Sequence, residues 1–267
     1  WAEELPHESW ADDMKEVIDR IVDDREFFEI QPDYAPNIIV GMARMDGWSV
    51  GIVANQREIV KARVGVKAGT DELQAGGVIY SDSADKAARF IMNCNQKRIP
   101  LVFLQDVSGF MVGSRAEHGG IIKDGAKMVN AVSNSVVPKF TVIVGNSYGA
   151  GNYAMCGRAY DPRMICAWPT ARIAVMGGAQ AAKTLLQIQK AKFARSGNEL
   201  DEGEEKRLLA EITAKYDAQT RPYYAAARMW VDEIIEPDQT RAWLSRGMEI
   251  ASLNPELPVF NPGVLQT

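Results

Sequence analysis

Histidine and cysteine are scarce in this sequence, and their scarcity limits the chemistry that the chain can carry. There are only two histidines, His7 and His118, so a metal site built on several histidines is excluded within one chain. The three cysteines, Cys94, Cys156 and Cys166, have no metal-ligand spacing and cannot all pair with one another. We therefore expect no metal ion, and reduced cysteines in an intracellular protein.

Long apolar runs and an excess of positive charge are also missing. No run approaches the roughly 20 residues that a membrane-spanning helix needs. A net charge of -5 argues against general binding to nucleic acid. The first residues, Trp1 to Pro6, have neither a signal-peptide pattern nor an initiator methionine. We expect no membrane span and no nucleic-acid partner, and the missing methionine indicates a fragment or a processed product.

The 267 residues have the composition of a globular enzyme, and from residue 80 onward apolar strands alternate with amphipathic helices. Because no linker interrupts this rhythm, we expect a single α/β domain over residues 1–267. Strands are predicted at 100–104, 139–144, 164–167, 173–176 and 230–235, and helices at 81–98, 119–135, 179–195, 202–219, 221–229 and 237–251. Before them come a helix at 12–23 and a hairpin, 40–45 with 48–53, that turns at Asp46-Gly47. The charged helices 202–219 and 237–251 are expected outside the core.

A glycine-rich turn, Gly145 to Gly157, follows the strand 140–144 and leads into a helix that begins Gly149-Ala150-Gly151. Small residues there let another molecule approach backbone N–H groups that have no acceptor within the helix. The helix dipole adds partial positive charge, so such a turn can hold an oxyanion, a phosphate or a polarised carbonyl. Close packing of the helix on the strand also favours glycine and alanine, and the turn alone does not separate the two interpretations.

Side-chain chemistry is weakly represented. The sequence has no Gly-x-Ser-x-Gly elbow, no P-loop and no dinucleotide fingerprint. His118 beside Glu117 is more often a structural residue at a helix start than a base. Asp106 can be a base or a cap for the loop that follows it, and Cys156 is more often a packed small hydrophobe than a nucleophile. The pattern favours catalysis by backbone amides. Two glycine-containing loops, 108–114 and 145–151, each follow a buried strand, and neighbouring strands would bring both to one side of the sheet.

Four ordered segments carry a family resemblance. Residues 106–113, 117–127, 148–157 and 167–177 read DVSGFMVG, EHGGIIKDGAK, YGAGNYAMCG and AWPTARIAVMG. They resemble the carboxyltransferase β-subunits of biotin-dependent acyl-CoA carboxylases, most of all the methylcrotonyl-CoA and geranyl-CoA carboxylase type. The resemblance implies the crotonase-like fold, an α/β fold of stacked ββα units with outer helices. It covers only the C-terminal half of that subunit, the half that takes biotin, whereas the N-terminal half binds acyl-CoA.

The resemblance also implies roles for particular residues. The second oxyanion hole of the family falls on Gly149, Ala150 and Gly151, whose amides would polarise the biotin ureido oxygen. The biotin pocket would be lined by two short segments. They supply Gly109, Phe110, Val112 and Gly113 from one loop, and Met176, Gly177 and Gly178 from another. In the family mechanism carboxybiotin releases CO2, the ureido enolate takes a proton from the acyl-CoA carbon, and the acyl enolate attacks the CO2. Biotin is then the base, which agrees with the lack of a convincing side-chain base.

The implied partners follow from the same resemblance. They are an N-terminal carboxyltransferase half or subunit, a biotin carboxylase with its biotin carrier, and further copies of the chain in a homo-oligomer, a hexamer in the family. The cofactor is biotin on a carrier domain and the substrate an acyl-CoA. The expected location is the cytoplasm, or the mitochondrial matrix in a eukaryote.

One stretch departs from the family pattern. Residues 56–76 form a basic insertion of about 20 residues between the strand that ends near Asn55 and the segment Gly77 to Tyr80. It can extend a subunit interface, contact CoA phosphates, alter substrate choice, or be a tolerated surface loop.

Two other functions stay open beside carboxyl transfer. One is a component of a biotin-dependent acyl-CoA decarboxylase, and the other is a non-catalytic half-subunit that acts as an assembly scaffold. Partner genes would distinguish the decarboxylase from the carboxylase: a membrane pump subunit for the former and a biotin carboxylase for the latter. Binding of the N-terminal half without turnover would identify the scaffold.

Overall fold

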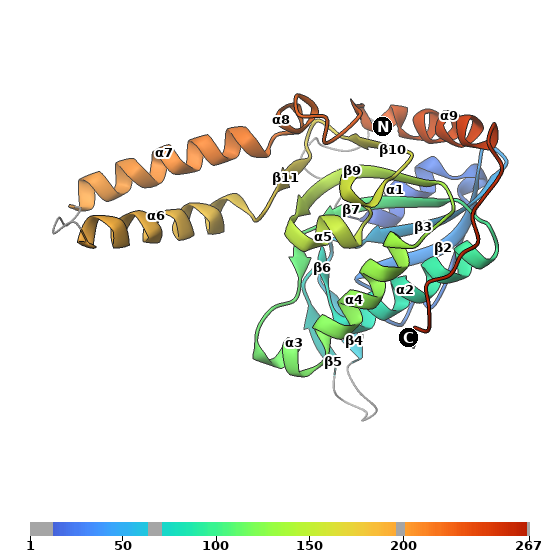
Figure 1. Ribbon diagram of the computed structural model, residues 1–267, viewed down its shortest axis with the longest axis horizontal. Coiled ribbons are helices and arrows are strands. Elements are labelled where there is room, and N and C mark those ends of the chain that lie inside the picture. The colour runs from blue at the N-terminus through green and yellow to red at the C-terminus, as the bar shows by residue number, and fades with distance from the viewer. Residues whose placement is uncertain (1–12, 64–70, 196–200, 266–267) are drawn as a thin grey trace.

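The computed structural model describes residues 13–63, 71–195 and 201–265, and its centre is a sheet with helices on both faces (Figure 1). The eight-stranded sheet has the order β1-β2-β3-β7-β9-β10-β12, and β11 also pairs with β9. β1, β2 and β3 are antiparallel neighbours, and the pairs from β3 to β12 are parallel. The strands of this sheet are β1 (Phe27–Glu29), β2 (Ile38–Met45), β3 (Trp48–Asn55), β7 (Leu101–Val107), β9 (Lys139–Tyr148), β10 (Met164–Ala167), β11 (Arg172–Ala174) and β12 (Glu233–Ile234).

Two sets of helices bury the two faces of the sheet. On one face α1 and α9 close an apolar cluster that contains Phe140 and Trp168. On the other face α2, α4 and α5 pack over Phe103 and Val107. The helices are α1 (Met14–Ile21), α2 (Ser81–Gln96), α3 (Ser114–His118), α4 (Ile121–Ser133), α5 (Gly149–Ala154), α6 (Gly178–Arg195), α7 (Glu202–Thr220), α8 (Pro222–Ala226) and α9 (Thr240–Ser252). This layered α/β architecture is the predicted fold class, and the crotonase-like assignment is confirmed by solved structures compared below.

Local turn chemistry explains why the predicted hairpin is correct. Asp46 and Gly47 have φ angles of 54° and 80°, the left-handed values that a two-residue hairpin turn requires. β2 and β3 pair in unbroken register from Met45 opposite Trp48 to Ile38 opposite Asn55. The carboxylate of Asp23 then accepts hydrogen bonds from the N–H groups of both turn residues, at 2.8 Å each.

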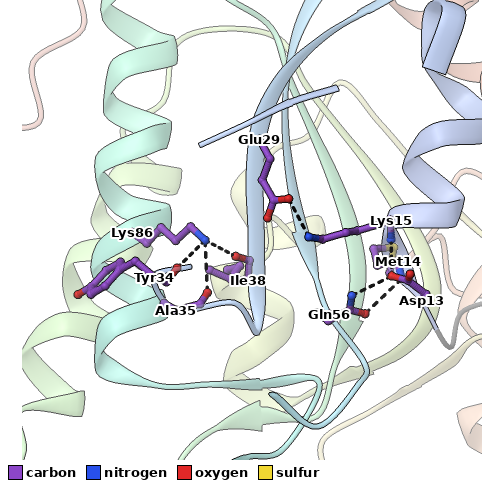
Figure 2. A network of polar contacts seen from close by, with 9 residues as sticks. All are labelled: Asp13, Met14, Lys15, Glu29, Tyr34, Ala35, Ile38, Gln56 and Lys86. Carbon is purple, nitrogen blue, oxygen red and sulfur yellow. Dashed lines mark hydrogen bonds and ion pairs between the residues drawn. The ribbon is translucent and has the colours of Figure 1, made fainter. Parts of the chain in front are cut away.

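The segment 56–76, predicted to be an insertion, contains a short strand pair. β4 (Val60–Arg63) and β5 (Asp71–Gln74) are antiparallel, and residues 64–70 lie outside the described part of the chain. Gln56 anchors the start of the insertion to α1, as Figure 2 shows. Its Oε1 accepts from Met14 N at 3.2 Å, and its Nε2 donates to the Asp13 carboxylate at 2.9 Å. The insertion is therefore tied to the sheet where it begins.

A buried lysine holds α2 against the turn that precedes β2. Figure 2 shows the Lys86 ammonium pointing at three backbone carbonyl oxygens. It donates to those of Tyr34 at 2.7 Å, Ile38 at 2.9 Å and Ala35 at 3.4 Å. Burial lowers the pKa of Lys86 to about 8, and the Glu29 carboxylate opposes this effect. The contact is thus electrostatically costly near neutral pH, although it satisfies backbone acceptors that would otherwise be buried without a donor.

Helix α9 corrects one prediction. The segment 237–251 was expected outside the core, but Leu244 and Met248 of α9 are buried in the cluster below the sheet. The Trp168 indole N–H donates to Thr240 Oγ1 at 3.0 Å, which fixes the start of the helix. Gly247 lets α9 approach closely, because a Cβ there would lie 2.8 Å from the ring of Phe140. Leu244 and Met248 thus bury one face of α9, and Trp243 and Ala251 pack against the same cluster.

Helices α6 and α7 form a hairpin that projects from the body of the molecule (Figure 1). Its root is held by Tyr216, whose hydroxyl donates to Met176 O at 2.9 Å. This location agrees with the expectation that helix 202–219 lies outside the core. In the described residues no helix has both the length and the apolarity that crossing a bilayer requires.

Candidate functional site

The glycine-rich turn lies where β9 ends and α5 begins, beside two other glycine-containing segments. Gly149 has a φ of +52°, and a Cβ there would lie 2.8 Å from Val175 O. A Cβ on Gly151 would lie 2.6 Å from Val107 Cγ2 and 3.1 Å from Gly109 Cα. The first residues of α5 are thus in close contact with the end of β7 and with the strand region around 175. The two loops identified in the sequence meet because β7 and β9 are parallel neighbours.

A cavity of about 640 Å³ opens beside this turn. Gly149 and Ala150 form part of its wall, and Ala150 is solvent exposed. The far wall is aromatic and carries one cation. It is contributed by Tyr153, Arg158, Tyr216, Tyr224 and Trp230. The α5 amides are in the first turn of a helix, so the helix itself offers them no acceptor.

The other residues expected around biotin are distributed over neighbouring hollows. Phe110 and Val112 line an apolar groove of about 380 Å³ against α4. Val112 also lines a third hollow of about 580 Å³, together with Gly113. Gly109 lies next to α5. Its Cα would be 3.1 Å from a Cβ placed on Gly151. Gly109, at the start of the 109–113 loop, therefore contacts the turn at Gly149 to Gly151, and the rest of the loop leads away from this turn.

The segment Met176 to Gly178 lies behind the wall of the 640 Å³ cavity. Val175 supplies the lining there, and the Tyr216 hydroxyl is bonded to Met176. Gly177 faces the ring of Tyr148, with 3.8 Å between that ring and a Cβ placed on the glycine. Gly178 is the first residue of α6. Residues 176–178 therefore lie beside the turn at Gly149 to Gly151, and the preceding residue, Val175, contacts Gly149.

The three side chains considered as acids, bases or nucleophiles lie outside this cavity lining. Asp106 is 2% exposed and accepts from Asn146 N at 2.8 Å and from Arg57 Nη1 at 3.2 Å, so its carboxylate joins β7 to β9 and to Arg57. His118 is exposed on α3. Cys156 is fully buried, and burial raises the pKa of its thiol to about 11. Among the described residues, no group of three or more histidine, cysteine or acidic side chains is arranged to hold a metal ion.

Sequence reasoning missed a set of buried polar side chains under α5. Gln105 and Ser147 have no exposed surface and are hydrogen-bonded to each other, and Asn152 donates to the Ser147 hydroxyl from the middle of the helix. The available signal was Gln105, a polar residue directly after the apolar run Leu101 to Leu104. It also missed Arg57, the residue of the insertion that pairs with Asp106.

The residues around the turn fit a bicyclic urea carried on a long chain. The cavity is open at exposed Ala150 and walled mainly by apolar surface, as a flat organic ring requires. The stretch from Tyr148 to Met155 contains no acidic residue, so negative charge that develops on a ligand oxygen would meet only N–H donors there.

Comparisons with known proteins identify the family of the chain. The carboxyl transferase domain family matches residues 3–261. The probable mitochondrial methylcrotonoyl-CoA carboxylase beta chain of Drosophila melanogaster is 46% identical over 258 residues, which are 95% of this chain and 41% of the fly protein. This chain therefore spans about two fifths of that relative.

Two solved structures share the fold. The geranyl-CoA carboxylase beta subunit of P. aeruginosa superposes with a TM-score of 0.76 at 36% identity, over 94% of this chain and 43% of that one. Transcarboxylase 12S, described as a hexamer with hydrolysed methylmalonyl-CoA bound, gives a TM-score of 0.77 at 36% identity, over 96% and 44% of the two chains.

Proposed function

This chain belongs to the carboxyl transferase domain family, and from that premise we propose that it is the biotin-side half of an acyl-CoA carboxylase carboxyltransferase. The reaction is transfer of a carboxyl group between biotin and an unsaturated acyl-CoA. The observation that carries the proposal is the cavity at the start of α5, where the backbone of Gly149 and Ala150 is open to a ligand.

The role of the protein in this reaction is electrostatic. When bound, biotin supplies the carboxyl group and a ureido oxygen on which negative charge develops during transfer. The N–H groups of Gly149, Ala150 and Gly151 are unused by the helix and lie at its positive end. Fixed donors of this kind stabilise a developing oxyanion without reorganising, and removing one typically costs a hundredfold to a thousandfold in rate.

The remaining residues shape the site. The rings of Tyr153 and Tyr224 exclude water from the cavity, which strengthens the amide–oxyanion interaction. We assign Gly109, Phe110, Val112 and Gly113 to the side on which the acyl-CoA half would meet biotin, since this loop starts against α5 and ends in exposed Val112. Met176, Gly177 and Gly178 hold Val175 against Gly149.

The partners belong to the same proposal. The missing length relative to the fly protein fits an N-terminal carboxyltransferase half that binds the acyl-CoA. A carrier domain presents the biotin, and several copies assemble, as in the hexamer described for transcarboxylase 12S. The proposed location is the cytoplasm, or the mitochondrial matrix if the source is a eukaryote.

The first experiment measures carboxyl transfer from carboxybiotin to a panel of acyl-CoAs, with this chain alone and with a candidate N-terminal half. Activity in the mixture only is expected, and the relative rates then rank the acyl groups. A stable complex without transfer would favour the scaffold function. Release of CO2 from a carboxylated acyl-CoA, without carboxylation in the other direction, would favour the decarboxylase.

The assignment of the amides is tested by Ala150→Pro. The proline removes one N–H that the helix does not use, and the exposed position leaves room for its ring. Ala150→Gly is the matched control because it keeps the N–H. We expect a loss of about a hundredfold or more in transfer for the proline variant only; full activity in folded protein would reject the oxyanion hole.

A further inference from the structure

Helix α5 cannot hold its own orientation. It is six residues long, and no side chain of the described residues caps its first turn. Helices this short are unstable without tertiary contacts, because nucleation costs more than a few hydrogen bonds return. The direction in which the Gly149 to Gly151 amides point must therefore be set by residues outside the helix.

The backbone of the sheet does not set it either. β7 and β9 pair regularly up to Gln105 opposite Ile143, but Val107 already lies opposite Ser147. β9 thus advances four residues where β7 advances two. The hydrogen-bond ladder between the two strands is therefore interrupted immediately before the turn at Gly149 to Gly151. An irregularity of this kind re-aims the chain that follows it and leaves the local register to be fixed by other contacts.

The side chain of Gln105 spans this interruption and both ends of α5. Its Oε1 accepts a hydrogen bond from the Ser147 hydroxyl at 2.7 Å, two residues before the helix. Its Nε2 donates to Met155 O at 2.7 Å, one residue after the helix. The Ser147 hydroxyl in turn accepts from Asn152 Nδ2 at 2.7 Å, in the middle of the helix. One fully buried side chain on β7 therefore connects to the beginning, middle and end of α5.

A buried glutamine at this position is costly unless its amide forms hydrogen bonds. Gln105 follows four buried apolar residues on β7, and an aliphatic side chain would avoid the cost of burying an amide. The amide is tolerated because its oxygen and its nitrogen both have partners at short distance.

We infer, on the basis of the carboxyl-transfer function proposed above, that Gln105 is the positioning residue of the site. It fixes the orientation of α5, through Ser147 and Met155, so that the amides of Gly149 and Ala150 are presented to the 640 Å³ cavity that these two residues line. Gln105 does not touch the reacting atoms itself. Its loss should lower the rate of transfer, because an error of about 1 Å in a donor can cost about a hundredfold, and should leave acyl-CoA binding unchanged.

The test compares two variants that each break a buried hydrogen bond at the same end of α5. Gln105→Met keeps the length of the side chain and removes both of its hydrogen bonds. Thr141→Val, the matched control, removes the 2.7 Å bond from Thr141 Oγ1 to Cys156 O, which has no connection to Ser147. Both are assayed as the complex with the N-terminal half, together with urea unfolding and hydrogen exchange of the peptide 145–157.

We expect both variants to lose stability. Only Gln105→Met should lower kcat, by about tenfold to a hundredfold, with KM for acyl-CoA within about twofold. Only it should speed exchange of the Met155 amide, which donates to Gly151 O in α5 at 3.0 Å. An unchanged kcat for folded Gln105→Met, in a complex whose wild type is active, would overturn the inference. Equal losses of kcat in both variants would do the same, because they would reflect stability alone.

Two further outcomes are separable. A wild-type complex that transfers no carboxyl group contradicts the proposed function, and the exchange of the Met155 amide still reports whether Gln105 orders α5. If Gln105→Met does not fold, Ser147→Ala breaks the same connection with a smaller loss of volume. It should show the same fall in kcat, and its retention of full kcat would overturn the inference.

Discussion

Gly151→Ala should separate the two glycine loops that form the site. A Cβ at this position would lie 2.6 Å from Val107 Cγ2 and 3.1 Å from Gly109 Cα, whereas ordinary van der Waals contact begins at 3.4 Å. Val107 is fully buried, so it has no free space to move into. The helix must therefore move away from the loop by several tenths of an ångström, up to about 0.8 Å if Val107 does not yield.

The size of the effect follows from this displacement. Overpacking by one methyl group typically destabilises a protein by about 1–3 kcal/mol. Moving a preorganised donor by nearly 1 Å can cost about a hundredfold in rate. We expect Gly151→Ala to lower the free energy of unfolding by about 1–3 kcal/mol and kcat for carboxyl transfer by about tenfold to a hundredfold. Urea unfolding of the chain and steady-state kinetics of its complex with the N-terminal half measure the two quantities.

Gly247→Ala is the matched control, because it overpacks a helix on the opposite face of the sheet. Its Cβ would lie 2.8 Å from Phe140 Cε1 and 3.1 Å from Met164 Sδ. The loss of stability should be similar to that of Gly151→Ala, and kcat should be retained below the unfolding temperature. The reasoning is refuted if Gly151→Ala keeps wild-type kcat, or if the two variants lose the same fraction of activity.

Three other outcomes are expected. Burial lowers the pKa of Lys86 to about 8, so its charge destabilises the folded state below pH 8. Because the unfolded lysine keeps its proton to about pH 10.5, the wild type should gain about 3 kcal/mol over Lys86→Met between these pH values in urea unfolding. Cys156, whose pKa is raised by burial to about 11, should resist iodoacetamide at pH 8 until urea is added, as mass spectrometry can record. His118→Ala, on exposed α3, should keep most of the transfer activity; a thousandfold loss in folded protein would identify an overlooked acid or base.

Features that depend on neighbouring residues in the sequence were predictable. Asp46-Gly47 specifies a hairpin turn wherever it lies between two apolar strands, because both residues accept positive φ angles. The start of α5 at Gly149 could be located for a related reason, since glycine marks the place where a strand turns sharply into a helix.

Features that depend on residues far apart in the sequence were not predictable. Asp106 could be read as a base or as a cap, and only the fold places Arg57 and Asn146 beside its carboxylate. The burial of α9 depends on Phe140 meeting Gly247, a contact across more than 100 residues. Gln105 lies outside the strand predicted at 100–104, whereas β7 continues to Val107. Its role was not predictable, because its partners Ser147 and Met155 are brought to it only by the fold.

The glycines of the turn at Gly149 to Gly151 cannot by themselves distinguish packing from catalysis. Gly149 is required by Val175 O, and Gly151 is required by Val107, so close packing accounts for both without any ligand. Ala150, between them, is different because it is exposed and lines the cavity. If the turn existed only for packing, the N–H of Ala150 would have no function and its removal would leave transfer unchanged. The comparison of Ala150→Pro with Ala150→Gly is therefore the measurement that separates the two interpretations, since the variants differ at this position chiefly in the backbone donor.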